Sequence, residues 1–470
     1  MKQKLPPGVF SHKEKDMDKF DTIAAVSTPP GTGGISCIRI SGENAFEIAK
    51  RVFSCGKKFE EIESHSVTHG KIINRERELL DEVLLLKMKK PKTYTREDVV
   101  EIHCHGGSVV TRNVLELLFK EGAVPAQPGE FTKRAFLNGR IDLSQAEAVM
   151  DLINSKTQKS EKSAIMQLEG RTGKEIKKTR QMIIELLSHI AVSIDYPEYE
   201  DDKITMEEAS KMVASIKKDL EKLIENYDTG RILREGLNVA VLGPPNAGKS
   251  TFINKVTGEE KAIVTHIPGT TRDVLEIQFS LNGYPIVLHD TAGIRETDDF
   301  IERIGIKKSL EIKEKSELII LILDAARGLD DETKSLIDQS NKNKTIFVIN
   351  KTDIKDGEEI SDYIGTKKII KGILSNDFGT IDILEAIQIR IEKGTLSIKD
   401  IAVTNARHKM HIDAALLSLE NTIETGLGNG YLDLMSVDLT IAAEELGKIT
   451  GESAGEDIIK TIFERFCVGK

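Results

Sequence analysis

Apolar residues recur with helical spacing in two separate parts of the chain, on either side of a long central segment. The earlier part carries them three or four residues apart at Ile183, Leu187, Ile190 and Ile194, and again at Val213, Ile216, Leu220 and Leu223. The later part repeats this spacing at Ile412, Leu416, Leu419 and Ile423. Such spacing places the apolar side chains on one face of a helix. A capping box of Thr205 and Glu208 predicts where one of these helices begins.

Short apolar runs predict strands elsewhere. Before about Leu137, residues 82–87 and 99–103 are rich in β-forming residues, and residues 109–120 have the pattern of a helix. The central segment has buried-strand patterns at residues 237–242, 284–289 and 345–349. The N-terminal part is therefore predicted to be a compact α/β unit, and the central segment a second α/β unit.

These patterns together predict a multidomain fold. Because the two ends of a domain commonly lie close together, the two helical parts are expected to form one all-α bundle that carries the central α/β domain as an insertion. The length of 470 residues agrees with about three domains. The predicted boundaries are residues 1–137 for the N-terminal domain, 138–235 and 395–470 for the two halves of the helical domain, and 236–394 for the inserted domain.

The net charge argues against a surface that is basic overall, and the apolar runs argue against a membrane-spanning or secreted protein. A formal net charge of −10 gives no global basic field, so any contact with RNA must be local or supplied by a partner. The lysine-rich residues 87–92 are a candidate local patch, with a solvated loop as the alternative. The longest strongly apolar run, residues 318–323, has the length of a strand, and the first twenty residues lack an apolar signal core. We therefore expect a cytoplasmic protein that has no membrane partner.

Cysteine usage predicts no disulfide framework, because the chain has four cysteines in 470 residues. The run His103, Cys104, His105 has no second ligand pair at zinc-site spacing and is predicted to be the end of a strand. Cys467 lies near the last residue, and its alternatives are a functional thiol and a small buried apolar side chain.

A phosphate-binding loop follows the predicted strand at residues 237–242. Residues 243–251 read Gly-Pro-Pro-Asn-Ala-Gly-Lys-Ser-Thr and match the Walker A pattern GxxxxGK[ST]. In such a loop backbone amides surround the β-phosphate, Lys249 reaches the β- and γ-oxygens, and Ser250 offers its hydroxyl to Mg²⁺. The expected nucleotide contacts are Asn246, Ala247, Gly248, Lys249, Ser250 and Thr251.

Two further motifs follow in the order that a GTPase requires. The strand at residues 284–289 leads into Asp290, Thr291, Ala292 and Gly293, which suit water-mediated Mg²⁺ binding and an amide contact to the γ-phosphate. The strand at residues 345–349 leads into Asn350, Lys351, Thr352 and Asp353, the NKxD pattern. The Asp353 carboxylate can accept from guanine N1–H and the N2 amino group together, whereas adenine presents an acceptor at N1. The motif therefore predicts GTP, with Ser375 in a last base-contacting loop.

The segment between these motifs has the pattern of a switch loop. It supplies Thr271 as a second hydroxyl for Mg²⁺. The expected contacts here are Thr265, His266, Ile267, Pro268, Gly269, Thr270 and Thr271. Ile294 occupies the position where Ras-like GTPases carry the water-orienting glutamine, so another group must position the attacking water. Glu302 is the acidic candidate, with an ordinary helix-surface residue as the alternative.

The ordered motifs GPPNAGKST, THIPGTTRD, DTAGIRE and NKTD resemble those of the bacterial tRNA-modification GTPase family called MnmE or TrmE. Residues 21–42, residues 128–147 and the terminal Phe-Cys-Val-Gly-Lys also resemble this family. The resemblance therefore covers the chain from about Asp21 to the last residue. It implies an N-terminal domain similar to a tetrahydrofolate-binding fold, an all-α helical bundle and an inserted Ras-like P-loop domain.

The resemblance also implies that K⁺ replaces the missing catalytic charge. Its ligands map onto Asn246, Thr265, Ile267 and Thr270, and the Mg²⁺ ligands onto Ser250 and Thr271. A cation between the β- and γ-phosphates neutralises developing charge as an arginine finger would. The family assigns water positioning to the residue that matches Glu302. The expected catalytic residues are Glu302 together with Lys249 of the phosphate loop and Cys467 of the terminal segment. His266 departs from the aspartate that is usual there.

The resemblance further implies a homodimer that binds folate through its N-terminal domain. The implied folate contacts are Arg39, Glu101, Arg140 and Lys470. A guanidinium suits the folate glutamate tail or ring carbonyl, and Glu101 could accept from the pterin amino group. Each position has an ordinary surface salt bridge as its alternative, Arg140 is often lysine in the family, and Val468 replaces the usual isoleucine.

The activity implied by the resemblance is GTP hydrolysis coupled to tRNA modification. With the FAD-dependent partner MnmG, in a heterotetramer, the protein would add a carboxymethylaminomethyl or aminomethyl group at C5 of the wobble uridine (U34). A 5-formyl- or 5,10-methylene-tetrahydrofolate would supply the carbon, and FAD would be held by the partner alone. The competing hypothesis is a potassium-dependent GTP switch that docks on ribosomes and modifies nothing.

Overall fold

The computed structural model describes residues 21–195, 204–258, 275–290, 316–366, 369–391, 403–429 and 432–470, without the side chains of residues 275, 276, 290, 377, 378 and 425–429. The chain divides into two compact units. One unit comprises Met1–Ala146 with Ala454–Lys470, and the other comprises Glu147–Ser453. The last residues of the chain thus belong to the same unit as the first strands.

A seven-stranded sheet forms the centre of the first unit, in the strand order β3-β4-β5-β6-β2-β1-β7. Its strands are β1 (Ile23–Val26), β2 (Ile35–Ser41), β3 (Phe53–Ser54), β4 (Ser66–Ile73), β5 (Leu79–Met88), β6 (Val99–His105) and β7 (Val124–Pro125). Its helices are α1 (Ala45–Val52), α2 (Ser108–Lys120), α3 (Glu130–Leu137) and α16 (Glu456–Phe463). The strands at residues 82–87 and 99–103 and the helix at residues 109–120 are confirmed.

The two faces of this sheet differ. Along β2 and β6 the side chains of Ile38, Ile40, Ile102 and Cys104 point toward α1 and α2 and are buried in the core. The alternate residues Cys37 and Arg39 of β2 and Glu101 and His103 of β6 lie on the other face, where they are only partly covered. We call this second surface the open face of the sheet.

Lys87 corrects one expectation, because it lies neither in a solvated loop nor on an RNA-binding patch. It occupies β5 and is 9% exposed. Its Nζ donates to the carbonyl oxygens of Phe59 and Ile62, both at 3.0 Å, and lies 4.8 Å from the Phe59 ring centroid. Burial lowers the pKa of this ammonium group. Short-range composition could not reveal this site, because its acceptors lie more than twenty residues away.

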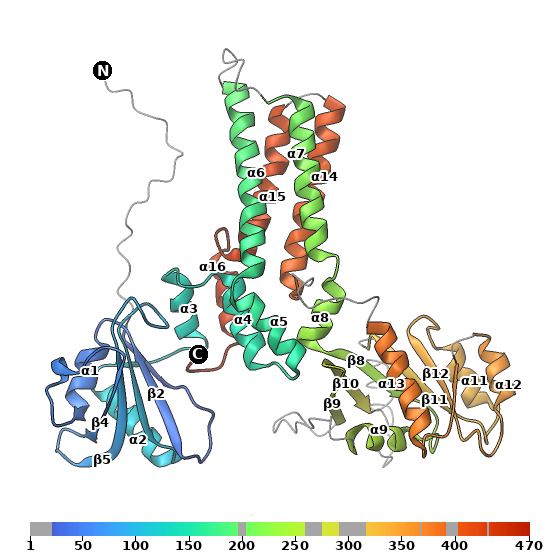
Figure 1. Ribbon diagram of the computed structural model, residues 1–470, viewed down its shortest axis with the longest axis horizontal. Helices are drawn as coiled ribbons and strands as arrows, with labels where there is room; N and C mark the ends of the chain where they lie inside the picture. The colour runs from blue at the N-terminus through green and yellow to red at the C-terminus, as the bar shows by residue number, and fades with distance from the viewer. Residues whose placement is uncertain are drawn as a thin grey trace, which may run out of the picture. The chain divides into compact units, whose positions relative to one another are not determined.

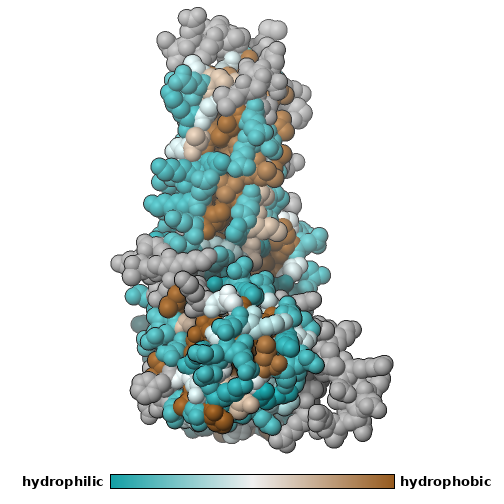
Figure 2. All heavy atoms as spheres, turned by 90° about the vertical axis from the view of Figure 1, so that its right-hand side faces the viewer, coloured by the Kyte–Doolittle hydropathy of each residue, from teal (hydrophilic) through white to brown (hydrophobic). Residues whose placement is uncertain are grey.

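Four long helices of the second unit run alongside one another, as Figure 1 shows: α6 (Arg171–Asp195), α7 (Met206–Ile224), α14 (Ala406–Asn429) and α15 (Leu432–Thr450). Their core contains Ile183, Ile190, Val213, Ile412 and Leu419, as the helical spacing predicts. The capping box is confirmed: Glu208 N donates to Thr205 Oγ1 at 3.2 Å, and Thr205 N donates to Glu208 Oε2 at 2.9 Å. The two helical parts therefore form one bundle, whose side view shows an apolar strip between polar residues (Figure 2).

Three shorter helices accompany the bundle: α4 (Leu143–Ile153), α5 (Gln158–Leu168) and α8 (Tyr227–Glu235). The inserted domain follows α8 and contains a six-stranded sheet in the order β13-β12-β11-β8-β10-β9. Its strands are β8 (Leu237–Leu242), β9 (Leu275–Leu281), β10 (Tyr284–Asp290), β11 (Leu318–Asp324), β12 (Thr345–Asn350) and β13 (Ile369–Lys371). Its helices are α9 (Lys249–Gly258), α11 (Asp331–Asp338), α12 (Glu358–Ile364) and α13 (Asp377–Ile391).

The strands β8, β10, β11, β12 and β13 are parallel, and β9 pairs antiparallel with β10. Parallel strands bring their carboxyl ends to one edge of the sheet, which is where ligands bind in open α/β folds. The three-part architecture, with an α/β unit, a helical bundle and an inserted α/β domain, is confirmed. Among the described residues, none of the helices combines the length and apolar character needed to cross a bilayer.

Candidate functional site

The phosphate loop joins β8 to α9, and its backbone requires glycine at two positions. Gly243 has φ 149°, and a Cβ there would lie 2.1 Å from the carbonyl oxygen of Ile322. Gly248 has φ 110°, and a Cβ there would lie 2.3 Å from Nδ2 of Asn350. Asn246 also has a positive φ, 61°, which asparagine tolerates better than most residues. The loop therefore packs closely against the neighbouring strands.

Lys249 and the start of α9 lie together at the predicted phosphate-binding loop. Lys249 Nζ donates to the carbonyl oxygens of Gly243 at 2.6 Å and of Pro244 at 2.8 Å, so the ammonium group lies at the loop. Ser250 and Thr251 are exposed in the first turn of the helix, while Ala247 is buried. The positive end of the helix dipole adds to the Lys249 charge and favours a phosphate here.

The NKxD residues connect the phosphate loop to the predicted base-binding loop. Asn350 Nδ2 donates to the carbonyl oxygen of Ala247 at 2.7 Å, and Leu374 N donates to Asn350 Oδ1 at 2.8 Å. Asn350 is 5% exposed, so this one side chain holds two loops together. Asp353 and Ser375 are both exposed at this edge.

The rest of the NKxD motif is held by its own contacts. Lys351 has φ 62°, and its Nζ pairs with Oδ2 of Asp324 at 2.6 Å. Thr352 Oγ1 donates to the carbonyl oxygen of Gly372 at 3.3 Å. Asp324 ends β11, and no pattern in the sequence marks it as a partner of Lys351. Its role depends on the parallel pairing of β11 with β12, which sets Asp324 beside Asn350.

Several predicted residues lie outside the described part of the chain. These are Thr265, His266, Ile267, Pro268, Gly269, Thr270, Thr271, Thr291, Ala292, Gly293 and Glu302. For Asp290 the backbone is described, and it lies opposite Val241 in the parallel pairing of β10 with β8. The predicted Mg²⁺ and γ-phosphate motif therefore begins beside the strand that leads into the phosphate loop.

A second group of predicted residues meets on the open face of the first unit. Arg39 on β2 lies opposite Glu101 on β6, and its Nε and Nη2 both lie 2.8 Å from Glu101 Oε1. Arg140 Nη1 donates to the carbonyl oxygen of Tyr94 at 3.1 Å. The Tyr94 ring centroid lies 5.4 Å from Cζ of Arg39 and 4.6 Å from Cζ of Arg140. One aromatic ring, which the sequence pattern did not single out, thus contacts both guanidinium groups.

The terminal residues are anchored in the same unit. The carbonyl oxygen of Cys467 accepts from Gly129 N at 3.3 Å, and the carbonyl oxygen of Gly469 accepts from Ser27 Oγ at 3.1 Å. Gly469 has φ 92°, and a Cβ there would lie 2.2 Å from the carbonyl oxygen of Val26. Lys470 is half-buried beyond this close contact, whereas the Cys467 thiol is exposed. The buried alternative for Cys467 is therefore wrong.

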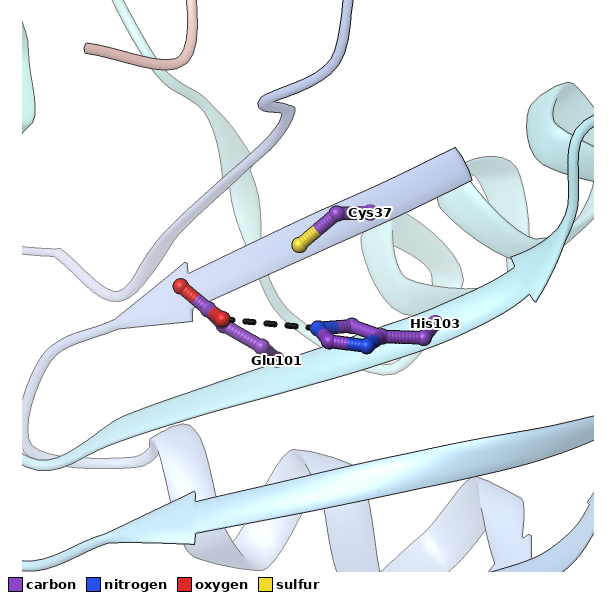
Figure 3. A group of neighbouring side chains, drawn as sticks. All are labelled: Cys37, Glu101 and His103. Carbon is purple, nitrogen blue, oxygen red and sulfur yellow. Dashed lines mark hydrogen bonds and ion pairs between the residues drawn. The ribbon is translucent and has the colours of Figure 1, made fainter. Parts of the chain in front are cut away.

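Cys37, Glu101 and His103 form a cluster on the open face (Figure 3). One ligand atom from each, a sulfur, a carboxylate oxygen and a ring nitrogen, all lie within 4.8 Å of one another. His103 Nε2 lies 3.5 Å from Glu101 Oε2. Burial, with a further contribution from the Glu101 carboxylate, raises the pKa of the Cys37 thiol to about 12. The strand end predicted for His103 to His105 is confirmed, but the cross-strand cysteine was missed because it lies on another strand.

Known proteins resemble this chain along almost its whole length. Residues 143–467 match the family model of the MnmE helical domain, and residues 22–140 match that of the GTP-binding protein TrmE N-terminus. A tRNA modification GTPase MnmE from Acetivibrio thermocellus is 50% identical over 459 residues, which cover 97% of this chain and 100% of that protein. Proteins of the same name from Alkaliphilus metalliredigens and Thermoanaerobacter pseudethanolicus are each 46% identical, covering 96% of this chain and 99% and 100% of theirs.

Proposed function

The chain belongs to the MnmE family of tRNA modification GTPases, and from this membership we propose that it hydrolyses GTP in the modification of the wobble uridine (U34) of tRNA. The observation that carries the proposal is the 50% identity to an MnmE protein over 97% of the chain. The phosphate loop and the NKxD loop, joined by Asn350, give the nucleotide-binding part of this function a physical basis.

The chemistry of the nucleotide site follows from its charges. Lys249 and the first turn of α9 attract the β- and γ-phosphates, and Asp353 selects guanine. Ser250 is exposed beside Lys249, which suits a hydroxyl ligand for Mg²⁺, with Thr271 as the proposed second ligand. Glu302 is proposed to position the attacking water, since Ile294 cannot.

A potassium ion is proposed as the second cation of this site. Asn246 stands exposed on the loop, where its side-chain oxygen is accessible to such an ion, so the described part of the site fits it. The other proposed ligands are Thr265, Ile267 and Thr270. A bound potassium ion supplies positive charge toward the bridging phosphate oxygen, as an arginine finger does in other GTPases.

The open face of the first unit is proposed to bind a tetrahydrofolate that supplies the added carbon. Arg39 and Arg140 both lie against the ring of Tyr94 and offer planar donors that match carboxylate geometry. Glu101 is held by Arg39 through Oε1, and its Oε2, which faces His103, is the proposed acceptor for a pterin amino group. Lys470 is the fourth proposed contact, and the exposed Cys467 is a proposed catalytic residue.

Partners complete the proposal. The protein would act as a homodimer with an FAD-bearing MnmG partner in a heterotetramer, and the product would carry an aminomethyl or carboxymethylaminomethyl group at C5. The net charge of −10 supports a division of labour in which the partner contributes to tRNA binding. Hydrolysis of GTP would move the inserted domain relative to the helical bundle, because switch ordering can be transmitted to packed helices.

The decisive experiment is mass spectrometry of tRNA nucleosides from cells that lack this chain. We expect the modified wobble uridines to disappear, to return with the wild-type gene, and to stay absent with Lys249→Ala. A control variant, Lys342→Ala, lies outside the phosphate loop and should restore the modification. Unchanged wobble uridines in the deletion strain would defeat the proposal.

A further inference from the structure

We propose that Cys37, Glu101 and His103 form a divalent-metal site on the open face of the N-terminal sheet, and that zinc is the ion it fits best. This site goes beyond the GTP, Mg²⁺, K⁺ and folate sites of the proposed function. It shares Glu101 with the proposed folate contacts and adds Cys37 and His103, which the folate proposal does not use.

Strand register brings the three ligands together. In the antiparallel pairing of β2 with β6, Cys37 lies opposite His103, and Arg39 lies opposite Glu101. Directly opposed residues lie on one face of a sheet, and so do residues two apart on one strand. Figure 3 shows the result, with the Cys37 sulfur and the His103 ring directed toward the Glu101 carboxylate. The backbone therefore fixes the cluster before any ion binds.

The distances suit one small ion. Two light-atom ligands of a tetrahedral zinc, each about 2.0–2.1 Å from the metal, lie about 3.3–3.4 Å apart. His103 Nε2 and Glu101 Oε2 are 3.5 Å apart, which is long for a hydrogen bond and close to that ligand spacing. The Cys37 sulfur, one ring nitrogen of His103 and one carboxylate oxygen of Glu101 all lie within 4.8 Å of one another. Small changes of side-chain rotamer would bring all three to bonding distance.

Glu101 can bind the metal ion while it keeps its contacts with the Arg39 guanidinium. Both contacts of the Arg39 guanidinium go to Oε1, at 2.8 Å, and this leaves Oε2 on the side of His103. A ligating carboxylate is ordinarily held by such an outer hydrogen-bond partner, which fixes its orientation. Arg39 would therefore act as a positioning residue for the metal ligand.

The donor set selects the ion. One thiolate, one imidazole and one carboxylate suit zinc, whereas magnesium and calcium require oxygen ligands throughout. Three protein ligands leave a fourth position for water or an anion, as in open zinc sites. The side chains of Glu101 and His103 are 15% and 32% exposed, so an ion can reach them from solvent. The cationic Arg39 favours an anion at that fourth position.

The test uses the purified full-length chain after removal of metal with a chelator. Zinc binding is measured by competition with a chromophoric chelator, and Co²⁺ is added separately because cobalt bound to a thiolate gives a near-ultraviolet charge-transfer band. We expect one zinc per chain and a cobalt–thiolate band. Cys37→Ser should abolish the band, and both Cys37→Ser and His103→Gln should weaken zinc binding by about 100-fold or more, beyond the loss of an outer partner.

Matched controls come from the same unit. Cys55→Ser removes another partly exposed thiol, and His69→Gln removes an imidazole that pairs with Glu82 elsewhere on the sheet. Both should keep zinc affinity and the cobalt band. Absence of the band in the wild type, or zinc affinity unchanged in both Cys37→Ser and His103→Gln, would overturn the proposal. Far-ultraviolet circular dichroism of each variant shows whether it is folded, so that loss of the cobalt–thiolate band can be told apart from unfolding.

Failure of this site and failure of the folate proposal are distinguishable. Arg140→Gln removes a proposed folate contact but no metal ligand, so it should weaken folate binding and leave the zinc titration unchanged. A wild-type chain that binds folate without zinc overturns only the metal site, and one that binds zinc without folate overturns only the folate site.

Discussion

Two residues of one motif, Asn350 and Asp353, have different physical roles. Asn350 is buried and connects two backbone loops, so its loss would leave an acceptor and a donor without partners. Asp353 is exposed at the same edge, where its carboxylate can meet a base. The first residue therefore holds two loops together, and the second remains the proposed contact that selects the base.

The base preference can be tested with Asp353→Asn. The asparagine amide keeps one acceptor and gains one donor, so it no longer matches the two donors of guanine, N1–H and the N2 amino group. It matches xanthine instead, which has a donor at N1 and a carbonyl acceptor at C2. Loss of a charge-assisted hydrogen bond of about 1.5–3 kcal/mol predicts roughly 10–100-fold weaker GTP binding. Calorimetry with GTP and xanthosine triphosphate measures the change. Asp362→Asn, an exposed residue of α12, is the control. Equal GTP affinity in wild type and Asp353→Asn would disprove the base contact.

Local motifs allow site residues to be proposed from the sequence, whereas residues joined across strands cannot be found in this way. Lys249 and Asp353 stand in contiguous patterns, so their neighbours along the chain identify them. Tyr94 and Cys37 acquire their partners through the pairing of distant segments, and no periodicity specifies which strand lies beside which. The residues of the switch segment that lie outside the described chain stay predictions.

Among the elements, the phosphate loop shows how strand, turn and helix combine into one site. Buried β8 fixes where the loop starts, two glycines allow its close approach to β11 and Asn350, and α9 supplies the positive end of a helix. Element boundaries followed from the sequence here, since residues 237–242 are those of β8. In contrast, β9 was not predicted, because its packing depends on β10, with which it forms a hairpin.

The loop also carries the prediction for potassium. We expect GTP hydrolysis to be much faster in potassium chloride than in sodium chloride, because a larger cation fits ligands drawn from the loop and the switch segment. Asn246→Gly removes the proposed side-chain ligand but keeps a residue that accepts the positive φ of 61°. This variant should lose most of the potassium stimulation while still binding GTP. Steady-state phosphate release in both salts is the measurement, and equal wild-type rates would refute the potassium site.

At the scale of the whole molecule, the two halves of the helical domain must pack together although the inserted domain separates them along the chain. Glu147 of α4 comes before the inserted domain, and Arg407 and His408 of α14 come after it. Arg407 Nε and Nη2 donate to the two oxygens of Glu147 at 3.0 and 2.7 Å, and His408 Nε2 lies 2.7 Å from Oε2. All three side chains are largely buried, so this network joins the two halves of the domain in a low-dielectric region.

Acidification should therefore weaken the helical domain. Burial by itself raises the pKa of Glu147, but the charges and hydrogen bonds of His408 and Arg407 outweigh it and hold that pKa well below its usual range. A carboxyl group with a lowered folded-state pKa stabilises the protein above its unfolded pKa, near 4.3, and loses this contribution as pH falls toward the folded value. Urea unfolding followed by circular dichroism should thus show a midpoint that decreases below about pH 5.

Glu147→Gln tests whether this network closes the domain. The variant leaves the buried Arg407 guanidinium without its counter-charge, so we expect the free energy of unfolding of the helical domain to fall by about 3–5 kcal/mol at pH 7. It should also lose much of the acid dependence, since the titrating carboxyl group is gone. The control is Glu420→Gln, which removes an exposed carboxylate of α14 that pairs with Lys217 of α7. This change should leave the urea midpoint almost unchanged. A Glu147→Gln protein as stable as the wild type, with the same pH profile, would mean that packing of the four long helices alone holds the two halves together.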